Sequence, residues 1–345
     1  MRVTQLDIAR LAQVSQATVS RVLAGDDRVD EAIRTRVLDV MRQKNYQPDV
    51  RARSLRLKRT GLIGLVLKRP SGGLSDDPFF AALIAGIVDE LAGQQYHLCV
   101  DVVSDDASQS GVYDEMLRTR RVDGLILVES RAVDDRIARL QRDEFPFVVI
   151  GNPMNERIAS VDNDNVRAGE IATRHLLDAG YSRIGFLGGP TGVTVSDDRL
   201  EGYCRAVDAA GLPWRIWHTE FGLENARQAA LSILRSEGRP DALVVLDDFM
   251  AFGVVLAARE RGVRLAADFG LVSFNDSSLC RLVEGGLSSV SLGIDRIVRT
   301  AVAKLLEVVE ERPTNRPSRE LVPSALVVRG SSLRPNSLEL EGVPA

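Results

Sequence analysis

A regular alternation of two residue patterns, beginning at Gly61, most constrains what this chain can fold into. Short apolar runs, typical of strands buried on both faces of a parallel sheet, alternate with longer segments whose apolar residues recur at helical spacing. This alternation predicts an α/β fold built on parallel sheets. The apolar runs are residues 61–67, 98–103, 124–128, 147–150, 184–187, 242–246 and 270–274.

The number of alternating segments predicts two lobes rather than one. The alternating region, residues 61–333, holds about 270 residues, which is too many for one small open sheet. We expect the chain to pass from the first lobe to the second near Asp162 to Asp164, and the helical pattern at 293–311 to return to the first lobe. Because ligands of such sheets bind beyond the carboxyl ends of the strands, a ligand is expected in the cleft between the lobes. The other helical patterns lie near 79–94, 109–120, 132–142, 165–180, 197–211, 224–237 and 249–262.

The first 45 residues form a separate pattern of three short helices. Thr4 followed by Asp7 predicts a capping box at the start of the first helix. Ser15 and Asp30 are suitable N-caps for the second and third helices. This arrangement predicts a helix-turn-helix, although a helical hairpin with no role in DNA binding would share the spacing.

The second of these helices carries side chains suited to reading DNA. Gln16, Ala17, Ser20 and Arg21 are predicted to project from its exposed side. A recognition helix reads base edges with residues near its N-terminus. Glutamine can pair with adenine, arginine with guanine, and alanine can contact the methyl group of thymine.

Charge is distributed unevenly along the chain. Residues 1–60 hold 13 Lys or Arg against 7 Asp or Glu, a net charge of +6, whereas the rest holds 31 against 41, a net charge of −10. A small basic segment on an acidic body is expected of a protein with a polyanionic partner at one end. The charge alone leaves open a solvated basic segment without such a partner.

Several other functions find no support in the sequence. No apolar run approaches the roughly 18 residues that cross a bilayer, and the three scattered cysteines indicate reduced thiols. We therefore expect a cytoplasmic protein without membrane association. The glycine-rich loop 188–192 lacks the Lys-Ser/Thr pair of a phosphate loop, and His97, His175 and His218 show no metal-ligand spacing. The chain is expected to be no enzyme and to need no cofactor or metal.

The N-terminal motifs resemble the signature of the LacI/GalR (lactose-repressor) family of regulators. The resemblance rests on Asp7-Ile-Ala-Arg-Leu-Ala12, Val14-Ser15 and Ala17-Thr-Val-Ser-Arg-Val-Leu23. It continues through Asn45–Pro48 over essentially the whole chain and ends in Leu326-Val-Val-Arg329 with Ser331-Ser332. It implies a sequence-specific transcriptional regulator, expected to be a repressor, with a periplasmic-binding-protein-like effector domain. The implied organisation is a helix-turn-helix domain (1–48), a hinge helix (49–60), an effector-binding and dimerisation domain (61–333) and a C-terminal tail (334–345). The first lobe would comprise about 61–162 and 293–322, and the second about 163–292 and 323–333.

The resemblance also implies which residues contact DNA. The hinge helix would enter the minor groove, where an apolar wedge partly unstacks the bases. Two residues depart from the family pattern: Gln13 replaces a frequent Gly in the turn, and Asp49 replaces the usual Asn at the hinge. A palindromic operator would be read by a homodimer, since half-site symmetry mirrors protein symmetry. The implied base contacts are Gln16, Ala17 and Arg21, the implied phosphate contacts are Thr4, Ser15, Thr18 and Ser20, and the implied minor-groove contacts are Ala52 and Leu55.

For the effector, the resemblance and the chemistry of the side chains point to a sugar or a related polyol. Carboxylates and amides accept hydroxyl protons, arginine donates two hydrogen bonds, and phenylalanine stacks on an apolar face. A pocket rich in carboxylates suits neutral polyhydroxy compounds or cations better than phosphorylated sugars. Asp77 and Asp248 could alternatively act as helix caps. The candidate effector contacts are Asp77, Phe79, Asp164, Arg199, Phe221, Asp247, Asp248 and Asn275.

Two questions stay open at this point. One alternative function is a small-molecule-binding protein, or an α/β enzyme, with an incidental helical N-terminal segment. Salt-dependent binding to a palindrome would distinguish the regulator from this alternative. The sequence also does not indicate whether the effector releases the protein from DNA or promotes binding.

Overall fold

The computed structural model describes residues 3–23, 25–46, 59–69, 77–312 and 318–334. The chain forms two compact units, Met1–Gly61 and Leu62–Ala345. Ala52 and Leu55 of the predicted hinge lie outside the described residues, as do residues 335–345 of the predicted tail.

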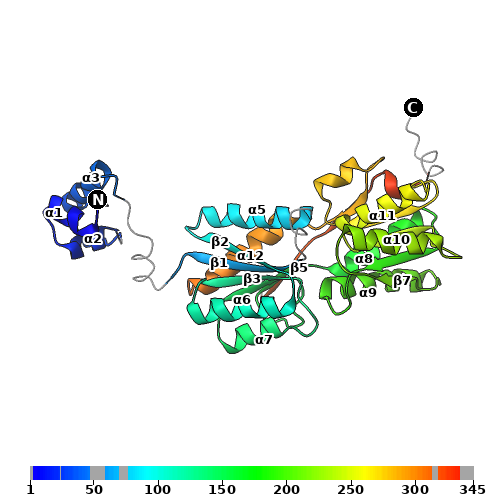
Figure 1. The fold of residues 1–345 in the computed structure, drawn as a ribbon, viewed down its shortest axis with the longest axis horizontal. Coiled ribbons are helices and arrows are strands. Elements are labelled where there is room, and N and C mark those ends of the chain that lie inside the picture. Colours follow the sequence, from blue (N-terminus) through cyan, green and yellow to red (C-terminus); the bar gives the residue numbers. More distant parts are fainter. Residues whose placement is uncertain (1–2, 24, 47–58, 70–76, 313–317, 335–345) are drawn as a thin grey trace. The chain divides into compact units, whose positions relative to one another are not determined.

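The N-terminal unit contains α1 (Gln5–Leu11), α2 (Gln16–Leu23) and α3 (Glu31–Gln43) (Figure 1). The predicted capping box is present, with Thr4 Oγ1 accepting from the backbone N–H of Asp7 and the Asp7 carboxylate accepting from the N–H of Thr4. Gln13 adopts a left-handed conformation (φ +55°), which explains why glycine suits this turn. The small core of the unit is formed by Ile8, Ala9, Ala12, Val19, Val22, Val37 and Met41.

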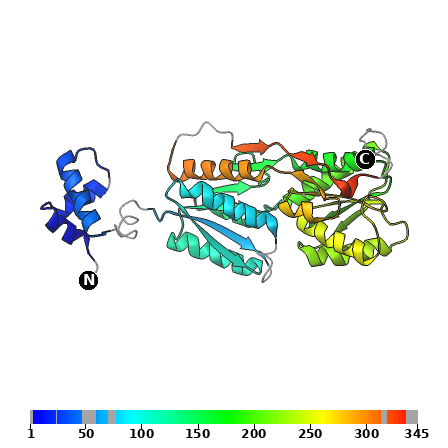
Figure 2. The same cartoon turned by 90° about the horizontal axis from the view of Figure 1, so that it is seen from above.

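The first lobe of the larger unit is a six-stranded parallel sheet covered on both faces by helices. The strand order is β11-β5-β4-β3-β1-β2. Figure 1 shows α5 on one side of the sheet and α6 and α7 on the other, and Figure 2 shows α12 (orange) beside α5. The strands are β1 (Leu62–Lys68), β2 (His97–Val103), β3 (Gly124–Val128), β4 (Phe147–Ile150), β5 (Ser160–Asn163) and β11 (Arg319–Val322). The helices are α5 (Pro78–Ala92), α6 (Asp106–Thr119), α7 (Asp135–Arg142) and α12 (Ile294–Val309).

The second lobe repeats this plan with the strand order β12-β10-β9-β8-β6-β7. Only β12 runs antiparallel to its neighbour among the strands described. Helices α8 and α9 share one apolar core with one face of the sheet, and α10 and α11 share another with the opposite face. The strands are β6 (Ile184–Gly188), β7 (Ile216–His218), β8 (Ala242–Val245), β9 (Gly270–Phe274), β10 (Ser288–Ser291) and β12 (Ala325–Val327). The helices are α8 (Asn165–Asp178), α9 (Thr194–Ala209), α10 (Leu223–Arg235) and α11 (Asp248–Glu260), with short 3-10 turns at Ser278–Leu282 and Gly330–Ser332.

The predicted fold class is confirmed, with differences in detail. The alternation did not indicate β5, β10, β11 or β12, because these strands are only three or four residues long and several are polar. Helix α9 begins at Thr194, three residues before the predicted start, and its N-cap Val193 makes no side-chain capping bond that could have marked the boundary. Among the helices described, none is long and apolar enough to cross a bilayer.

The chain crosses between the lobes three times, after β5, β10 and β11. The buried side chain of Asn163 joins the three crossings. Its Nδ2 donates to the carbonyl oxygens of Leu292 (3.0 Å) and Val322 (2.8 Å). One amide group therefore holds the three hinge segments in register.

Candidate functional site

A cavity of about 110 Å³ lies between the two lobes. In each sheet the first strand, β1 or β6, lies between the second and the third, so the chain reverses its direction of winding at that strand. Crevices at such reversals, beyond the carboxyl ends of the strands, are where open α/β sheets bind ligands. The lining residues obey this rule: Arg69 follows β1, Glu129 follows β3, Asp247 lies just beyond β8 and Asn275 follows β9.

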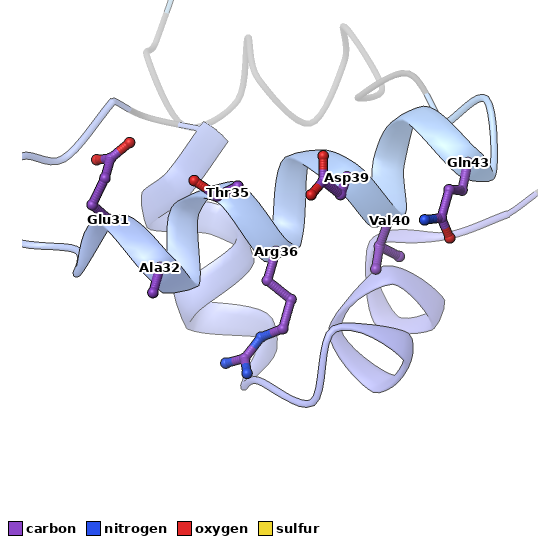
Figure 3. Close-up of a pocket in the computed structure, with 7 residues that line it drawn as sticks. All are labelled: Glu31, Ala32, Thr35, Arg36, Asp39, Val40 and Gln43. Atoms are coloured by element: carbon purple, nitrogen blue, oxygen red, sulfur yellow. The ribbon is translucent and has the colours of Figure 1, made fainter.

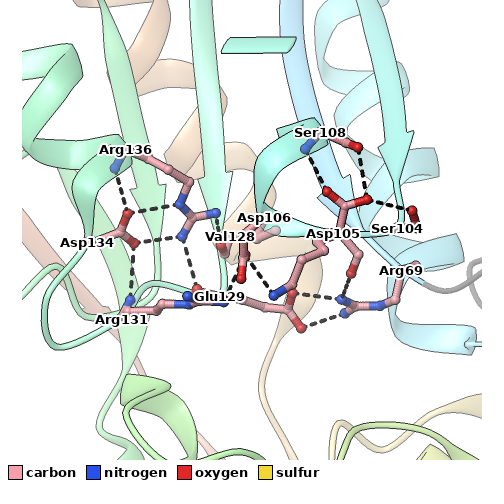
Figure 4. Close-up of polar contacts among 11 residues, drawn as sticks. Arg69, Ser104, Asp105, Asp106, Ser108, Val128, Glu129, Arg131, Asp134 and Arg136 are labelled. Atoms are coloured by element: carbon pink, nitrogen blue, oxygen red, sulfur yellow. Dashed lines mark hydrogen bonds and ion pairs between the residues drawn. The ribbon is translucent and has the colours of Figure 1, made fainter. Parts of the chain in front are cut away.

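The first lobe contributes a buried ion pair to the cavity wall. Both terminal nitrogens of Arg69 contact the Glu129 carboxylate, Nη1 to Oε2 at 2.8 Å and Nη2 to Oε1 at 2.5 Å (Figure 4). Nη1 also donates to the carbonyl oxygen of Lys68. The guanidinium carbon lies 4.1 Å from the ring centroid of Phe80 and 5.7 Å from that of Phe221. This arginine is therefore neutralised within its own lobe.

The second lobe contributes an arginine with a different environment. Arg199 is 4% exposed; its Nε donates to Oδ1 of Asn165 (2.9 Å) and its Nη1 to the carbonyl oxygen of Leu246 (2.5 Å). Its guanidinium lies 4.3 Å from the ring centroid of Phe274. These partners are neutral, and burial lowers the pKa of Arg199 to about 10 although Asp247 and other carboxylates oppose the shift. No ion pair among the described residues neutralises its positive charge, which is therefore available to a ligand in the cavity.

Three aspartates complete the charged lining. Asp77 caps α5 by accepting from the N–H of Phe79 (3.0 Å), and Asp247 caps α11 by accepting from the N–H of Met250 (2.7 Å). Oδ2 of Asp162 is buried and has no hydrogen-bond partner in the described part of the chain. Burial raises the pKa of all three carboxyl groups, to about 7 for Asp247, where Asp77 adds to the shift, and to about 7 for Asp162.

The structure gathers most of the predicted effector contacts in one place. Asp77, Phe79, Arg199, Phe221, Asp247 and Asn275 all line the cavity.

Asp164 and Asp248 are not in the lining, so we do not carry these two predicted contacts into the site. Asp164 is exposed and caps α8 by accepting from the N–H of Arg167. Asp248 is fully buried, and its oxygens accept from the hydroxyls of Ser273 and Ser289 and from the N–H of Ser277. Its hydrogen-bonding capacity is used inside the second lobe.

Sequence reasoning missed several residues of the cavity wall. Arg69 and Glu129 lie at the ends of two predicted strands, so the rule on carboxyl ends could have selected them. Asn163, Asn165 and Thr194 carried no comparable signal. Asn165 connects two charged groups, because its Nδ2 donates to Asp162 and its Oδ1 accepts from Arg199.

Direct hydrogen bonds join the lobes at the rim of the cavity. The N–H of Thr194 donates to the carbonyl of Ser130 (3.0 Å), and their hydroxyl oxygens lie 2.9 Å apart. The N–H of Ala132 donates to the carbonyl of Gly192 (3.0 Å). We call these contacts the interlobe clasp. Ser130 and Thr194 also line the cavity, so these interlobe hydrogen bonds lie in its wall.

In the N-terminal unit, the predicted base-reading residues share an exposed surface. Gln16, Ala17 and Arg21 are exposed on α2. Ser15 precedes the helix, and its Oγ accepts from the N–H of Thr18 (3.1 Å) and lies 2.9 Å from its hydroxyl. The helix N-terminus is thus held by a cap while the following residues remain accessible.

The predicted phosphate contacts have less uniform surroundings. Thr4 and Ser15 are exposed, whereas Thr18 and Ser20 are half-buried.

The outer face of α3 carries a shallow depression (Figure 3). Its charged side chains are exposed and of both signs, and no buried polar group converges on it. We assign no ligand to this surface. The depression is lined by Glu31, Ala32, Thr35, Arg36, Asp39, Val40 and Gln43.

Comparison with known proteins decides the family. Residues 4–49 match the model of bacterial regulatory proteins of the lacI family, and residues 173–332 match a periplasmic binding protein-like domain. The ribose operon repressor of Haemophilus influenzae is 30% identical over 330 residues, which cover 94% of this chain and 97% of that protein. The chain belongs to the LacI family. The resemblance inferred from the N-terminal motifs is thereby confirmed, and this LacI-family chain is a DNA-binding transcriptional regulator.

Solved structures agree with this assignment. The complex of the transcriptional regulator CelR with cellobiose is 26% identical, with a TM-score of 0.73 over 96% of this chain and all of that one. The lac repressor dimer bound to operator and the anti-inducer ONPF gives a TM-score of 0.83 over the same shares of the two chains. At 23% identity this second likeness supports the fold alone.

Proposed function

We propose that this LacI-family chain is a homodimeric repressor whose affinity for a palindromic operator is set by a sugar or related polyol bound between the lobes. The observation that supports this most strongly is the cavity itself, where hydrogen-bonding groups from both lobes converge beside the interlobe clasp. A ligand that spans such a cavity changes the free energy of lobe closure, which differential affinity can convert into a change in DNA binding. The protein would act in the cytoplasm, by binding rather than by catalysis.

The chemistry of the cavity suits a polyhydroxy ligand. Arg199 and Asn275 can donate to ring and hydroxyl oxygens, the aspartates can accept from hydroxyls, and Phe79 and Phe221 supply apolar walls. The CelR structure, which resembles this chain, contains cellobiose. A cavity of about 110 Å³ is smaller than the roughly 300–1,000 Å³ of typical ligand pockets. A sugar would therefore have to separate the lobes on its way in.

A dimer is supported by exposed apolar side chains on an edge strand. Val100 and Val102 lie two residues apart on β2, which ends the first sheet, and Val88 of the adjacent helix α5 is 47% exposed. The second lobe exposes Leu256, Leu279 and Leu282, the last at 80%. Apolar groups in this amount on a soluble chain are expected to be covered by a second copy.

Selection of binding sites from random DNA by the full-length protein tests the proposal. The selected site should be a palindrome, and affinity for it should fall steeply as salt increases because phosphate contacts release counterions. Arg21→Ala should weaken binding to that site by about 1–3 kcal/mol and relax base preference at one position of each half-site. Leu55→Ala should also weaken operator binding while leaving ligand binding alone. Equal affinity of the wild type for selected and scrambled DNA would refute the proposed DNA-reading role.

A further inference from the structure

The charges that line the interlobe cavity are unbalanced. Four carboxylates face it, those of Asp77, Glu129, Asp162 and Asp247, together with two arginines, Arg69 and Arg199. If all are ionised, the lining carries a net charge of −2. A buried excess of negative charge is costly, and it is relieved when a carboxyl group keeps its proton or when a cation binds beside it.

The hydrogen bonds show where the imbalance lies. Arg69 and Glu129 neutralise each other through two contacts, so neither is available to a third charge. Arg199 donates to a side-chain amide and a backbone carbonyl, and none of the ion pairs among the described residues includes it. Asp162 has a further cation beside it, because Nη2 of Arg319 lies 4.0 Å from its Oδ2. The single charge of Arg199 therefore remains against two aspartates without an ion pair, Asp77 and Asp247.

The aspartates retain acceptor capacity that nothing in the described chain uses. One oxygen of Asp77 and one of Asp247 serve as helix caps, and no hydrogen bond within the described residues reaches the second oxygen of either. Only 6% of the surface of Asp162 is exposed; its Oδ2 accepts no hydrogen bond in the described part of the chain and lies 4.0 Å from Nη2 of Arg319. These oxygens belong to both lobes, because Asp77 begins α5 and Asp247 precedes α11.

The compensating cation is organic rather than metallic. Among the described residues, no three His, Cys, Asp or Glu side chains are close enough together to hold a metal ion. An ammonium group, in contrast, needs only separate acceptors, because each of its three N–H bonds points in a different direction. Phe79 and Phe80 of the first lobe and Phe221 of the second, which also line the cavity, would cover the apolar face of a ring that carries the amine.

We infer that the effector carries a positively charged amine, held between the carboxylates of Asp77 and Asp247, so that the ligand is an amino sugar rather than a neutral or phosphorylated sugar. The inference rests on the proposed function and adds the charge of the ligand to it. An ammonium at this position bridges the two lobes, since each carboxylate comes from a different one. A phosphate group there would face the same carboxylates and be repelled.

Matched pairs of sugars test the inference. Calorimetric titration of the full-length protein would compare D-glucosamine with D-glucose, D-galactosamine with D-galactose, and D-mannosamine with D-mannose. The N-acetyl derivatives serve as neutral controls of larger size. We expect at least one amino sugar to bind tenfold or more tightly than its hydroxyl counterpart and its N-acetyl derivative. If no amino sugar binds more tightly than its neutral counterpart, the inference is overturned.

Three variants locate the amine. Asp77→Asn and Asp247→Asn preserve side-chain size and can still cap their helices, and each should weaken amino-sugar binding tenfold or more. Binding of the paired neutral sugar should weaken by a clearly smaller factor, because an asparagine oxygen can still accept from a hydroxyl but no longer carries the charge that attracts an ammonium. Asp164→Asn is the matched control, because Asp164 caps α8 outside the cavity. An amino-sugar preference that survives both cavity substitutions would overturn the assigned position.

The failure of this inference differs from the failure of the proposed function. Tight binding of neutral sugars that also alters operator affinity would overturn the inference and support the proposed function. Binding of no sugar of either kind would count against both. Operator selection remains an independent test of DNA binding.

Discussion

The two lobes have the same strand order and place their ligand-facing residues at the same structural position, yet they treat buried charge differently. In the first lobe, Arg69 is paired with Glu129 at two contacts. In the second lobe, Arg199 is bound by neutral groups, and Asp247 accepts only the N–H at the start of its helix. Topology thus determines where a cleft residue lies, whereas local partners determine whether its charge is available to a ligand.

The difference has a consequence for how the lobes contribute to function. Separation of the lobes leaves the Arg69–Glu129 ion pair intact, because both residues belong to the first lobe and move together. The charges of Arg199 and Asp247 on the second lobe form no ion pair, so a ligand that bridges the cleft stabilises them most. We therefore expect Arg199 and Asp247 of the second lobe to bind the ligand together with Asp77 of the first lobe, and the Arg69–Glu129 pair to provide a preformed wall.

Removal of the two arginines should have unequal effects on stability. Arg199→Met leaves the acceptors on Asn165 and Leu246 without this donor and removes a positive charge that favours the ionised forms of Asp162 and Asp247. It should lower the free energy of unfolding by roughly 3 kcal/mol. Arg69→Met should cost only about 1 kcal/mol, because Glu129, with 24% of its side chain exposed, can be hydrated. Denaturant unfolding of the two variants measures both values. Equal losses would show that the lobes do not differ as we describe.

Loss of the side-chain amide of Asn163, which links the segments that connect the two lobes, should have the next largest effect on stability. Asn163→Ala removes two buried hydrogen bonds and leaves the carbonyls of Leu292 and Val322 without this donor, at a cost of roughly 2 kcal/mol. Asn155→Ala is a suitable control, since its side chain bonds only to a local N–H in an exposed turn. Thermal unfolding would compare the two variants. A loss no larger than that of the control would indicate that Asn163 does not hold the crossings together.

Titration of Asp247 should make the free energy of unfolding depend on pH. Burial and the neighbouring Asp77 raise the pKa of Asp247 to about 7, above the ordinary aspartate value of 3.8. Between about pH 4 and 7 the folded state retains a proton that the unfolded state has lost, so this group lowers stability as pH rises. Asp247→Asn should therefore be more stable than the wild type at pH 8, and the difference should shrink as pH falls and vanish near pH 4.

A matched substitution in the first lobe sharpens this result. Glu129→Gln removes one partner of an ion pair and should lower stability at pH 8 rather than raise it. Unfolding by urea at a series of pH values would follow both variants. A destabilised Asp247→Asn variant at pH 8 would contradict the unpaired state of this carboxylate.

The arrangement of the lobes was predictable because central strands are continuous apolar runs. Strand β6 was predicted at 184–187 and spans Ile184–Gly188. Strand β10, in contrast, is Ser-Ser-Val-Ser, and its hydroxyl groups are buried because Asp248, Ser331 and Ser332 bond with the strand. A strand stabilised by distant polar partners leaves no apolar signature in its own sequence.

The site was only partly predictable for a related reason. Asp247 and Asp248 are adjacent, and nothing in their sequence context indicates that the first faces the cavity and the second faces three serines. Similarly, Arg69 and Glu129 are 60 residues apart, and their pairing depends on β1 and β3 being neighbours. The order of strands in a sheet is a tertiary property, so pairs formed across it are visible only in the fold.

The central claim is that occupation of the cleft controls DNA binding, and one titration tests it most directly. Affinity of the full-length protein for its selected palindrome would be measured with and without the tightest-binding sugar, in the wild type and in Arg199→Met. We predict that the sugar changes operator affinity at least tenfold, in either direction, in the wild type and leaves it unchanged in the variant. A sugar that binds the wild type with no effect on operator affinity would contradict the account.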